Sequence, residues 1–248
     1  MFGLGGGILV VPTLYLCLSY YQGIPANLVM HMAVATSLAL MILNTCNVTY
    51  KRYKSGEMLM SMVKLLASPI MLGALLGAAL SDYLHSNILR YFFITFMVYT
   101  IVSALVRKGF TKNRTIDDFK IPNKPVAVLV GFATGLVSVL LGIGGSVITL
   151  PYLRRAKMPM KNATAVANAL TLAVAVVGVV TYVFTGWDYG HLPKYSLGFV
   201  YLPAFVGMAI GTFIGVPLGI HWSRLLADKL TAKLYIVVLV IVLIMMVV

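Results

Sequence analysis

Two glycine-rich stretches, far apart in the chain, contain the residues whose type and spacing could do chemistry. Gly3-Leu4-Gly5-Gly6-Gly7 is followed by Pro12, and Gly142-Ile143-Gly144-Gly145-Ser146 is followed at the same distance by Pro151. Glycine weakens a helix interior and adopts positive φ freely, so each cluster predicts a break within apolar helical sequence. A helix that restarts there directs unpaired backbone N–H groups and the positive end of its dipole at the break.

Two such helix starts facing each other predict an anion site that needs no lysine or arginine. The binding candidates at the two breaks are Gly5, Gly6, Gly7, Gly144, Gly145 and Ser146. An alternative stays open, in which the glycines serve close helix packing alone. Two copies in related places favour the anion site.

Polar side chains inside otherwise apolar segments supply the remaining candidates. Three are expected to line the anion site: Thr36, Ser37 and Asn168. Four more are candidates for a polar pathway or for coupling: His31, Asn44, Asn47 and Thr171. Histidine exchanges a proton near neutral pH. The alternative is that the amides and hydroxyls bond across helices, each contributing about 0.6 kcal/mol, and that His31 lies at the membrane interface.

No arrangement of residues indicates an enzyme or a metal site. The four histidines lie near segment ends without the spacing of metal ligands. The sequence contains no Ser/His/Asp constellation and no Walker motif. We therefore expect no catalytic residue and no cofactor. Cys17 and Cys46 lie in apolar segments and are expected to be free thiols.

The composition is that of a polytopic membrane protein, which makes the expected fold class all-α. Of the 248 residues, 60% are hydrophobic and 10% are charged, and the mean hydropathy is +0.97. Soluble domains carry about 25% charged residues. The apolar runs approach or exceed the ~20 residues that cross a bilayer core. The net charge of +13 indicates basic loops beside membrane segments rather than nucleic-acid binding.

The chain divides into two related halves. Each half contains a glycine motif and a Pro-x3-Gly-x3-Gly segment, which begins at Pro69 in the first half and at Pro203 in the second. Small residues four apart predict close helix packing. We assign residues 1–106 to a first transmembrane repeat, 107–124 to a basic linker and 125–248 to a second repeat. Few residues precede the first motif, so either upstream residues are missing or the first repeat lacks that arm.

The positive charges decide whether residues 126–153 cross the membrane. If every apolar run crosses, the lysines and arginines are shared almost evenly between the two sides. If 126–153 is a hairpin that enters and leaves on one side, all of them except Arg90 and Lys194 fall on one side, which the positive-inside rule favours. Each repeat then crosses three times, so the two repeats are inverted relative to each other. This arrangement predicts a cytoplasmic linker and an external C-terminus.

The paired motifs resemble those of the sulfite exporter TauE/SafE family, the 4-toluene sulfonate uptake permease group. The resemblance covers nearly the whole chain and rests on Gly3-x-Gly5-Gly6-Gly7-x4-Pro12, Gly142-x-Gly144-Gly145-Ser146-x4-Pro151, Ala35-Thr36-Ser37-Leu38 and Gly73-x3-Gly77. It implies a secondary transporter of sulfite, sulfonates, sulfoacetate or related anions in the bacterial inner membrane. Two departures from the family pattern bear on the substrate: Ser146 replaces the third glycine, and Asn168-Ala169 replaces the usual Thr-Ser pair.

The sequence is therefore interpreted as an exporter of a small sulfur-containing anion, working by alternating access around a midplane site. Its expected partners are that anion and the lipid bilayer, with protons as a candidate coupling ion and an oligomer left open. Two alternatives remain. The first is an anion channel with the same site, and the second is a membrane scaffold or assembly protein that does not transport.

Overall fold

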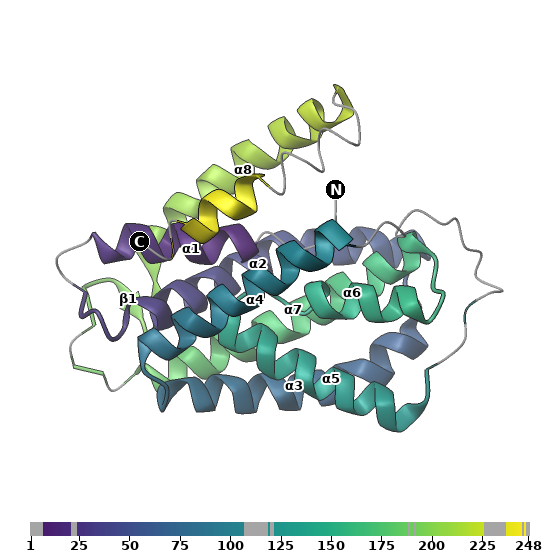
Figure 1. Cartoon of the computed structure of the whole chain (residues 1–248), viewed down its shortest axis with the longest axis horizontal. Coiled ribbons are helices and arrows are strands. Elements are labelled where there is room, and N and C mark those ends of the chain that lie inside the picture. Colours follow the sequence, from purple (N-terminus) through teal and green to yellow (C-terminus); the bar gives the residue numbers. More distant parts are fainter. Residues whose placement is uncertain are drawn as a thin grey trace.

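The computed structural model describes residues 7–20, 24–106, 119, 122–187, 189, 190, 192–225, 237–244 and 246, and these residues are mostly helical (Figure 1). In chain order the elements are α1 (Gly7–Ser19), α2 (Val29–Lys54), α3 (Met60–Asp82), α4 (Ser86–Val106), α5 (Lys124–Leu141), α6 (Ser146–Arg155), α7 (Met160–Thr185), β1 (Ser196–Leu197), β2 (Val200–Tyr201) and α8 (Leu202–Leu225). Most of the expected 107–124 linker lies outside the described residues.

Five helices in the described part of the chain are long and apolar enough to span a membrane: α2, α3, α4, α5 and α7. The prediction of an all-α polytopic membrane protein is confirmed. Helices α1 and α6 are shorter, with 13 and 10 residues. At 1.5 Å per residue, α6 is about 15 Å long, half the thickness of a ~30 Å bilayer core. The small antiparallel hairpin of β1 and β2 was not predicted from the sequence.

Helix α2 lies at the centre of the bundle. It contacts α1, α4, α5, α7 and α8, and every residue from Val29 to Leu38 is buried. A helix enclosed on all sides is apolar or small all round, which is why this segment shows no amphipathic stripe. Beyond Met41 many side chains of α2 become exposed, so the second half of the helix leaves the core.

Helices α5 and α6 form a hairpin, as the charge distribution predicted. Helix α5 ends at Leu141, its C-cap residue Gly142 adopts φ +63°, and Gly144 in the turn adopts φ +73°. Both values lie in the left-handed region, where glycine carries no steric penalty. Helix α6 then runs back toward the end of the bundle at which α5 begins (Figure 1).

Two hydrogen bonds show that the basic loops after α2 and α6 lie at the same end of the bundle. Arg52 Nη1 donates to the carbonyl oxygen of Lys161 at 3.2 Å, and Asn162 Nδ2 donates to the carbonyl oxygen of Glu57 at 2.8 Å. A hairpin requires this placement, whereas a full crossing by residues 126–153 would separate the two loops. At the opposite end, Arg90 Nε donates to the carbonyl oxygen of Met246 at 2.7 Å.

Candidate functional site

The turn between α5 and α6 is buried, and two of its residues, Gly142 and Gly144, have little room for a side chain. A Cβ on Gly142 would lie 2.9 Å from Val11 Cγ2 and 3.1 Å from Val34 Cα. A Cβ on Gly144 would lie 2.6 Å from Thr171 Cγ2. The contacts at 2.9 and 2.6 Å are tighter than real side chains adopt, and the one at 3.1 Å is unusually tight, so the turn packs its backbone directly against α1, α2 and α7.

The amino end of α6 is held by α7. Ser146 N donates to Thr171 Oγ1 at 2.9 Å, and that hydroxyl in turn donates to the carbonyl oxygen of Ala167 at 2.9 Å. Gly145 occupies the N-cap position of α6 and has no side chain that could cap the helix. The backbone amides of Val147 and Ile148, which follow Ser146, belong to the first helical turn, where no carbonyl of the same helix can accept from them. The predicted pathway residue Thr171 therefore contacts the predicted anion site.

Ser146 carries a hydroxyl without a partner at this helix start. The residue is 1% exposed, and its Oγ makes no hydrogen bond among the described residues. Leaving a buried polar atom unsatisfied costs about 1–3 kcal/mol. Together with the first-turn amides, this hydroxyl makes a group of donors suited to an oxyanion.

Gly7, the one described glycine of the first motif, contacts the second motif. Gly7, the first residue of α1, lies so close to the turn that a Cβ there would be 2.7 Å from the carbonyl oxygen of Gly142 and 2.9 Å from Ile143 Cα. Helix α1 runs from the middle of the bundle toward one end, and α6 runs from the middle toward the other (Figure 1). The predicted site residues Gly5 and Gly6 lie outside the described residues.

Ser37 and Thr36 lie beside the turn on α2, both fully buried. Ser37 Oγ donates to the carbonyl oxygen of Gly142 at 3.0 Å. Thr36 Oγ1 accepts from the backbone amide of Tyr201 at 3.1 Å, which ties α2 to the β hairpin. The structure therefore brings Ser37 to the glycine turn, whereas the Thr36 hydroxyl already accepts a hydrogen bond from Tyr201 of β2.

The other predicted residues are more dispersed. Asn168 is half-buried on α7, one turn before Thr171. Asn44 and Asn47 are exposed on the second half of α2, beyond the enclosed segment, and their pathway role stays a prediction. His31 is buried near the start of α2, where its Nε2 lies 2.8 Å from the carbonyl oxygen of Ser81.

Sequence reasoning missed Met41. Its side chain fills the space between the two motifs, because a Cβ on Gly7 would overlap its Cε and a Cβ on Gly144 would lie 3.0 Å from its Sδ. Met41 is 3% exposed. A methionine within an apolar run carries no signal that separates such a contact from ordinary packing.

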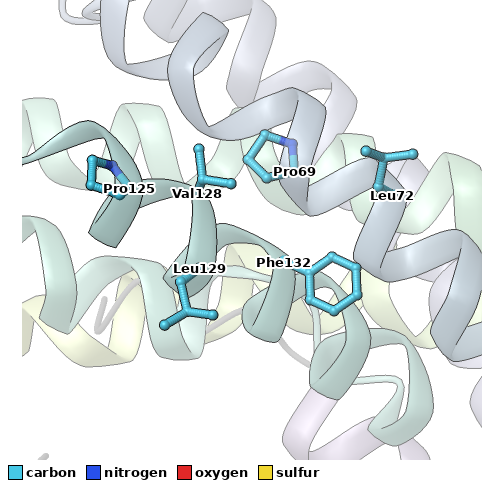
Figure 2. A pocket seen from close by; sticks show the side chains of 6 residues that line it. All are labelled: Pro69, Leu72, Pro125, Val128, Leu129 and Phe132. Carbon is cyan, nitrogen blue, oxygen red and sulfur yellow. The ribbon is translucent and has the colours of Figure 1, made fainter.

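A hollow of about 450 Å³ on the surface formed by α3 and α5 is not an anion site. Figure 2 shows its lining, which consists of Pro69, Leu72, Pro125, Val128, Leu129 and Phe132. None of these side chains can donate a hydrogen bond, and most of them are exposed apolar groups that suit a lipid-facing surface. No group of three or more His, Cys, Asp or Glu side chains that could hold a metal ion occurs in the described part of the chain.

The sequence profile of the family described as sulfite exporter TauE/SafE matches residues 1–246. The chain belongs to the TauE/SafE family. Among curated relatives, a probable membrane transporter protein of Haemophilus influenzae is 27% identical over 221 residues, which covers 88% of this chain and 81% of the relative. A probable membrane transporter protein of Methanocaldococcus jannaschii is also 27% identical, covering 92% of this chain and 82% of the relative.

A third relative is the probable membrane transporter protein YunE of Bacillus subtilis, which is 25% identical and covers 98% of this chain and 89% of the relative. No solved structure matches the chain significantly. The expected family is confirmed, and this TauE/SafE protein is a membrane transporter and not an enzyme.

Proposed function

We propose that this TauE/SafE protein is a secondary transporter that exports small sulfur-containing anions, with sulfite, sulfonates and sulfoacetate as the substrate class. The proposed site lies where the start of α6 meets the start of α1. The observation that carries the proposal is the buried, unpartnered hydroxyl of Ser146 at the amino end of α6. The family description, sulfite exporter, supports the choice of anion.

The chemistry of the site favours an oxyanion over a cation. A sulfur oxyanion offers several acceptor oxygens, and the start of α6 offers the amides of Val147 and Ile148, the Ser146 hydroxyl and a positive dipole end. The carbonyl oxygen of Gly142 would repel an anion, but Ser37 Oγ donates to it at 3.0 Å and reduces its negative charge. Asn168 on α7 is proposed to donate to the substrate when it is bound.

The two sequence repeats, 1–106 and 125–248, are proposed to rock against each other around this site. Their glycine motifs touch through Gly7, Gly142 and Met41, so a relative shift would open the site toward one side or the other. The basic end of the bundle, with the 107–124 linker, is assigned to the cytoplasm by the positive-inside rule. The C-terminus is assigned to the outside, in the bacterial inner membrane. An inside-negative potential favours anion export, and protons are the proposed coupling ion.

The test is electrical current across proteoliposomes on rapid exchange into sulfite, thiosulfate, sulfoacetate, taurine, sulfate or chloride. We expect a saturable response to one or two sulfur anions, together with counterflow, which a channel does not show. An electroneutral cycle is checked in parallel by uptake of sulfite labelled with ³⁵S. Folded protein that gives neither current nor uptake with any sulfur anion would overturn the proposal.

The decisive variant is Ser146→Ala. Loss of a hydrogen bond to a charged ligand costs about 1.5–3 kcal/mol, so the apparent affinity should fall by about 10- to 100-fold. Thr134→Val is the matched control, because Thr134 is also a buried hydroxyl but donates to the carbonyl oxygen of Val130 in its own helix. An equal loss of affinity in both variants would contradict a direct role for the Ser146 hydroxyl.

A further inference from the structure

Helix α2 changes its surroundings at Met41. The part of the helix before it is enclosed, whereas Asn44, Asn47 and Lys51 are exposed. Asn44 follows Ser37 by seven residues and Lys51 follows Asn44 by seven, so the three lie along one face of the helix. Asn47 lies beside them, and we call Asn44, Asn47 and Lys51 the Asn44 strip. Met41 lies on the same face, one helical turn from Ser37 and one from Asn44.

The two amides of the Asn44 strip lie at the depth of the hydrocarbon core. Lys51 belongs to the basic last turn of α2, which the positive-inside rule assigns to the cytoplasmic interface. Measured along the helix axis from Lys51, Asn47 lies about 6 Å and Asn44 about 10 Å inside that interface. Met41 lies about 15 Å inside it, which is the middle of a ~30 Å core.

Exposed amides at this depth require water. Neither Asn44 nor Asn47 makes a hydrogen bond to another side chain or backbone group in the described part of the chain. Lipid tails offer no hydrogen-bond partner, so polar side chains within membrane segments face protein or a water-filled space. Since both side chains are exposed rather than covered by protein, water is their partner. The positive charge of Lys51 at the outer end of the strip attracts anions toward it.

The corresponding position of the second repeat is apolar. Thr36 and Asn168 are equivalent in the two repeats, and eight residues further on Asn44 in α2 corresponds to Val176 in α7. Val176 is 43% exposed, which suits a lipid-facing position. The second half of α7 leads away from the basic end of the bundle. A strip of exposed amides is therefore a feature of α2, between the glycine turn and the basic end, and does not follow from the repeat.

The side chain of Met41 closes the inner end of the Asn44 strip. Long side chains of a helix lean toward its amino end, so Met41 extends over the Ser37 side of the strip. A Cβ on Gly7 would overlap Met41 Cε, and a Cβ on Gly144 would lie 3.0 Å from Met41 Sδ. Met41 thus bridges the start of α1 and the α5–α6 turn, and it is 3% exposed. It lies between the proposed anion site and the strip.

Methionine suits a closure that has to move. Its unbranched side chain has three rotatable bonds and adapts to different surroundings more easily than a branched or aromatic one. The residues that it contacts at the closure, Gly7 and Gly144, have no side chains that could interlock with it. A rotation of Met41 away from these glycines opens a route from Ser37 to Asn44 along one face of α2.

We propose that Met41 is the gate on the basic side of the anion site, and that the Asn44 strip is the hydrated route between this gate and the cytoplasm. Lys51 draws an anion to the route, the amides of Asn44 and Asn47 donate hydrogen bonds to it, and Met41 blocks it until its side chain rotates. The role of the gate in transport rests on the proposed function, whereas the hydration of the strip and the closure by Met41 are measured without a substrate.

The strip is tested by thiol labelling of the full-length protein in lipid nanodiscs, which leave both faces of the membrane accessible. The variant is Asn44→Cys in protein that also carries Cys17→Ala and Cys46→Ala, and the probe is the anion 2-sulfonatoethyl methanethiosulfonate. The reactive thiolate forms readily in water and poorly in apolar surroundings. We therefore expect Asn44→Cys to be labelled. Absence of labelling in folded protein would overturn the hydrated route.

The chain offers two matched controls for this labelling. Cys46 is exposed and lies at the depth of the strip, but two residues from Asn44 it faces the opposite side of α2. Val176→Cys places a thiol at the equivalent exposed position of α7. Both face lipid, so each should react at least about tenfold more slowly than Asn44→Cys, because little thiolate forms there. Equal rates at Asn44→Cys and Cys46 would overturn the proposal.

The gate is tested with Ser37→Cys, because Ser37 is fully buried behind Met41. The thiol should be unreactive while Met41 is present. Met41→Ala should raise its labelling rate at least about tenfold, since the truncation removes most contacts that hold the closed state. Met62→Ala, which truncates a methionine of α3 that is 1% exposed, is the control and should leave Ser37→Cys unreactive.

If Met41→Ala does not fold, Met41→Val replaces it, because valine keeps more of the buried volume but cannot reach both glycines. Labelling of Ser37→Cys that stays absent in folded Met41→Ala or Met41→Val protein would overturn the gate. Labelling that rises equally with Met62→Ala would also overturn it, because the effect would then be a general loosening of the bundle.

The outcomes separate this inference from the proposed function. Labelling of Asn44→Cys, and of Ser37→Cys once Met41 is truncated, in protein that responds to no sulfur anion would support the gate and overturn the transported substrate. Saturable transport of a sulfur anion, with neither thiol labelled, would support the transport proposal and overturn the gate and its route.

Discussion

Helices α3 and α8 carry the same Pro-x3-Gly-x3-Gly pattern but have different surroundings. In α3, a Cβ on Gly73 would overlap the carbonyl oxygen of Phe132, and a Cβ on Gly77 would lie 2.8 Å from the carbonyl oxygen of Leu136. In α8, a Cβ on Gly207 or Gly211 would meet no atom of the described chain within 4 Å. Figure 1 shows α3 running alongside α5, whereas α8 extends away from the bundle.

The difference shows that small residues permit close packing but do not create it. Helix α5 carries its own pair of glycines, and a Cβ on Gly135 would overlap the carbonyl oxygen of Ile70 in α3. The two small-residue faces therefore bring the backbones of α3 and α5 into direct contact, which strengthens van der Waals packing between membrane helices. In the described part of the chain, no helix packs closely against the face of α8 that carries Gly207 and Gly211.

The largest expected effect is Gly73→Ala. The new methyl group would strike a backbone carbonyl, which cannot move as a side chain can, so α3 and α5 must separate. Overpacking of this kind costs about 1–3 kcal/mol, and we expect the upper end of that range. The measurement is thermal unfolding in detergent, followed by the loss of the monodisperse peak in size-exclusion chromatography. An unchanged midpoint would contradict the tight α3–α5 contact.

Gly131→Ala tests a second glycine of the α3–α5 contact, where the obstructing atom is of a different kind. A Cβ at this position would lie 2.9 Å from Pro69 Cγ, which belongs to a side chain and not to the backbone. We expect a smaller loss of about 1 kcal/mol. The second substitution Pro69→Ala should restore part of the thermal stability, whereas Phe132→Ala should not rescue Gly73→Ala, because the obstructing atom there is a backbone oxygen.

The smallest expected effect is Gly207→Ala, the counterpart of Gly73→Ala in the second repeat. Nothing in the described chain obstructs the methyl group, and alanine is favoured over glycine within a helix by up to about 1 kcal/mol. The unfolding midpoint should therefore stay the same or rise slightly. A loss as large as that of Gly73→Ala would mean that α8 packs as closely as α3 does, and the contrast between the two helices would be wrong.

Several features of the candidate site could be predicted from sequence because they depend on local properties. The helix break at Gly142–Gly145 follows from the freedom of glycine at positive φ, which the structure uses at Gly142 and Gly144. The α5–α6 hairpin followed from the distribution of lysine and arginine. Ser146 was identified because it lies at the predicted helix start.

The partners of those residues could not be predicted, because they come from distant parts of the chain. Thr171 caps α6 from α7, 25 residues away, and Ser37 reaches Gly142 across 105 residues. The Thr36 hydroxyl was expected to face the substrate, but it accepts a hydrogen bond from Tyr201, 165 residues away. Such pairings depend on which helix faces meet, and the hydropathy of a single segment does not contain that information.

The sequence by itself determined that this TauE/SafE protein is a helical membrane protein with a glycine-broken segment at 142–145, because hydropathy and backbone freedom are properties of individual residues and short segments. Only the tertiary structure decided that Met41 lies between the two motifs, that Asn44 and Asn47 lie outside the enclosed part of α2, and that a β hairpin covers Thr36. The physical reason is that close packing and hydrogen-bond satisfaction are settled between elements, after each helix has already formed.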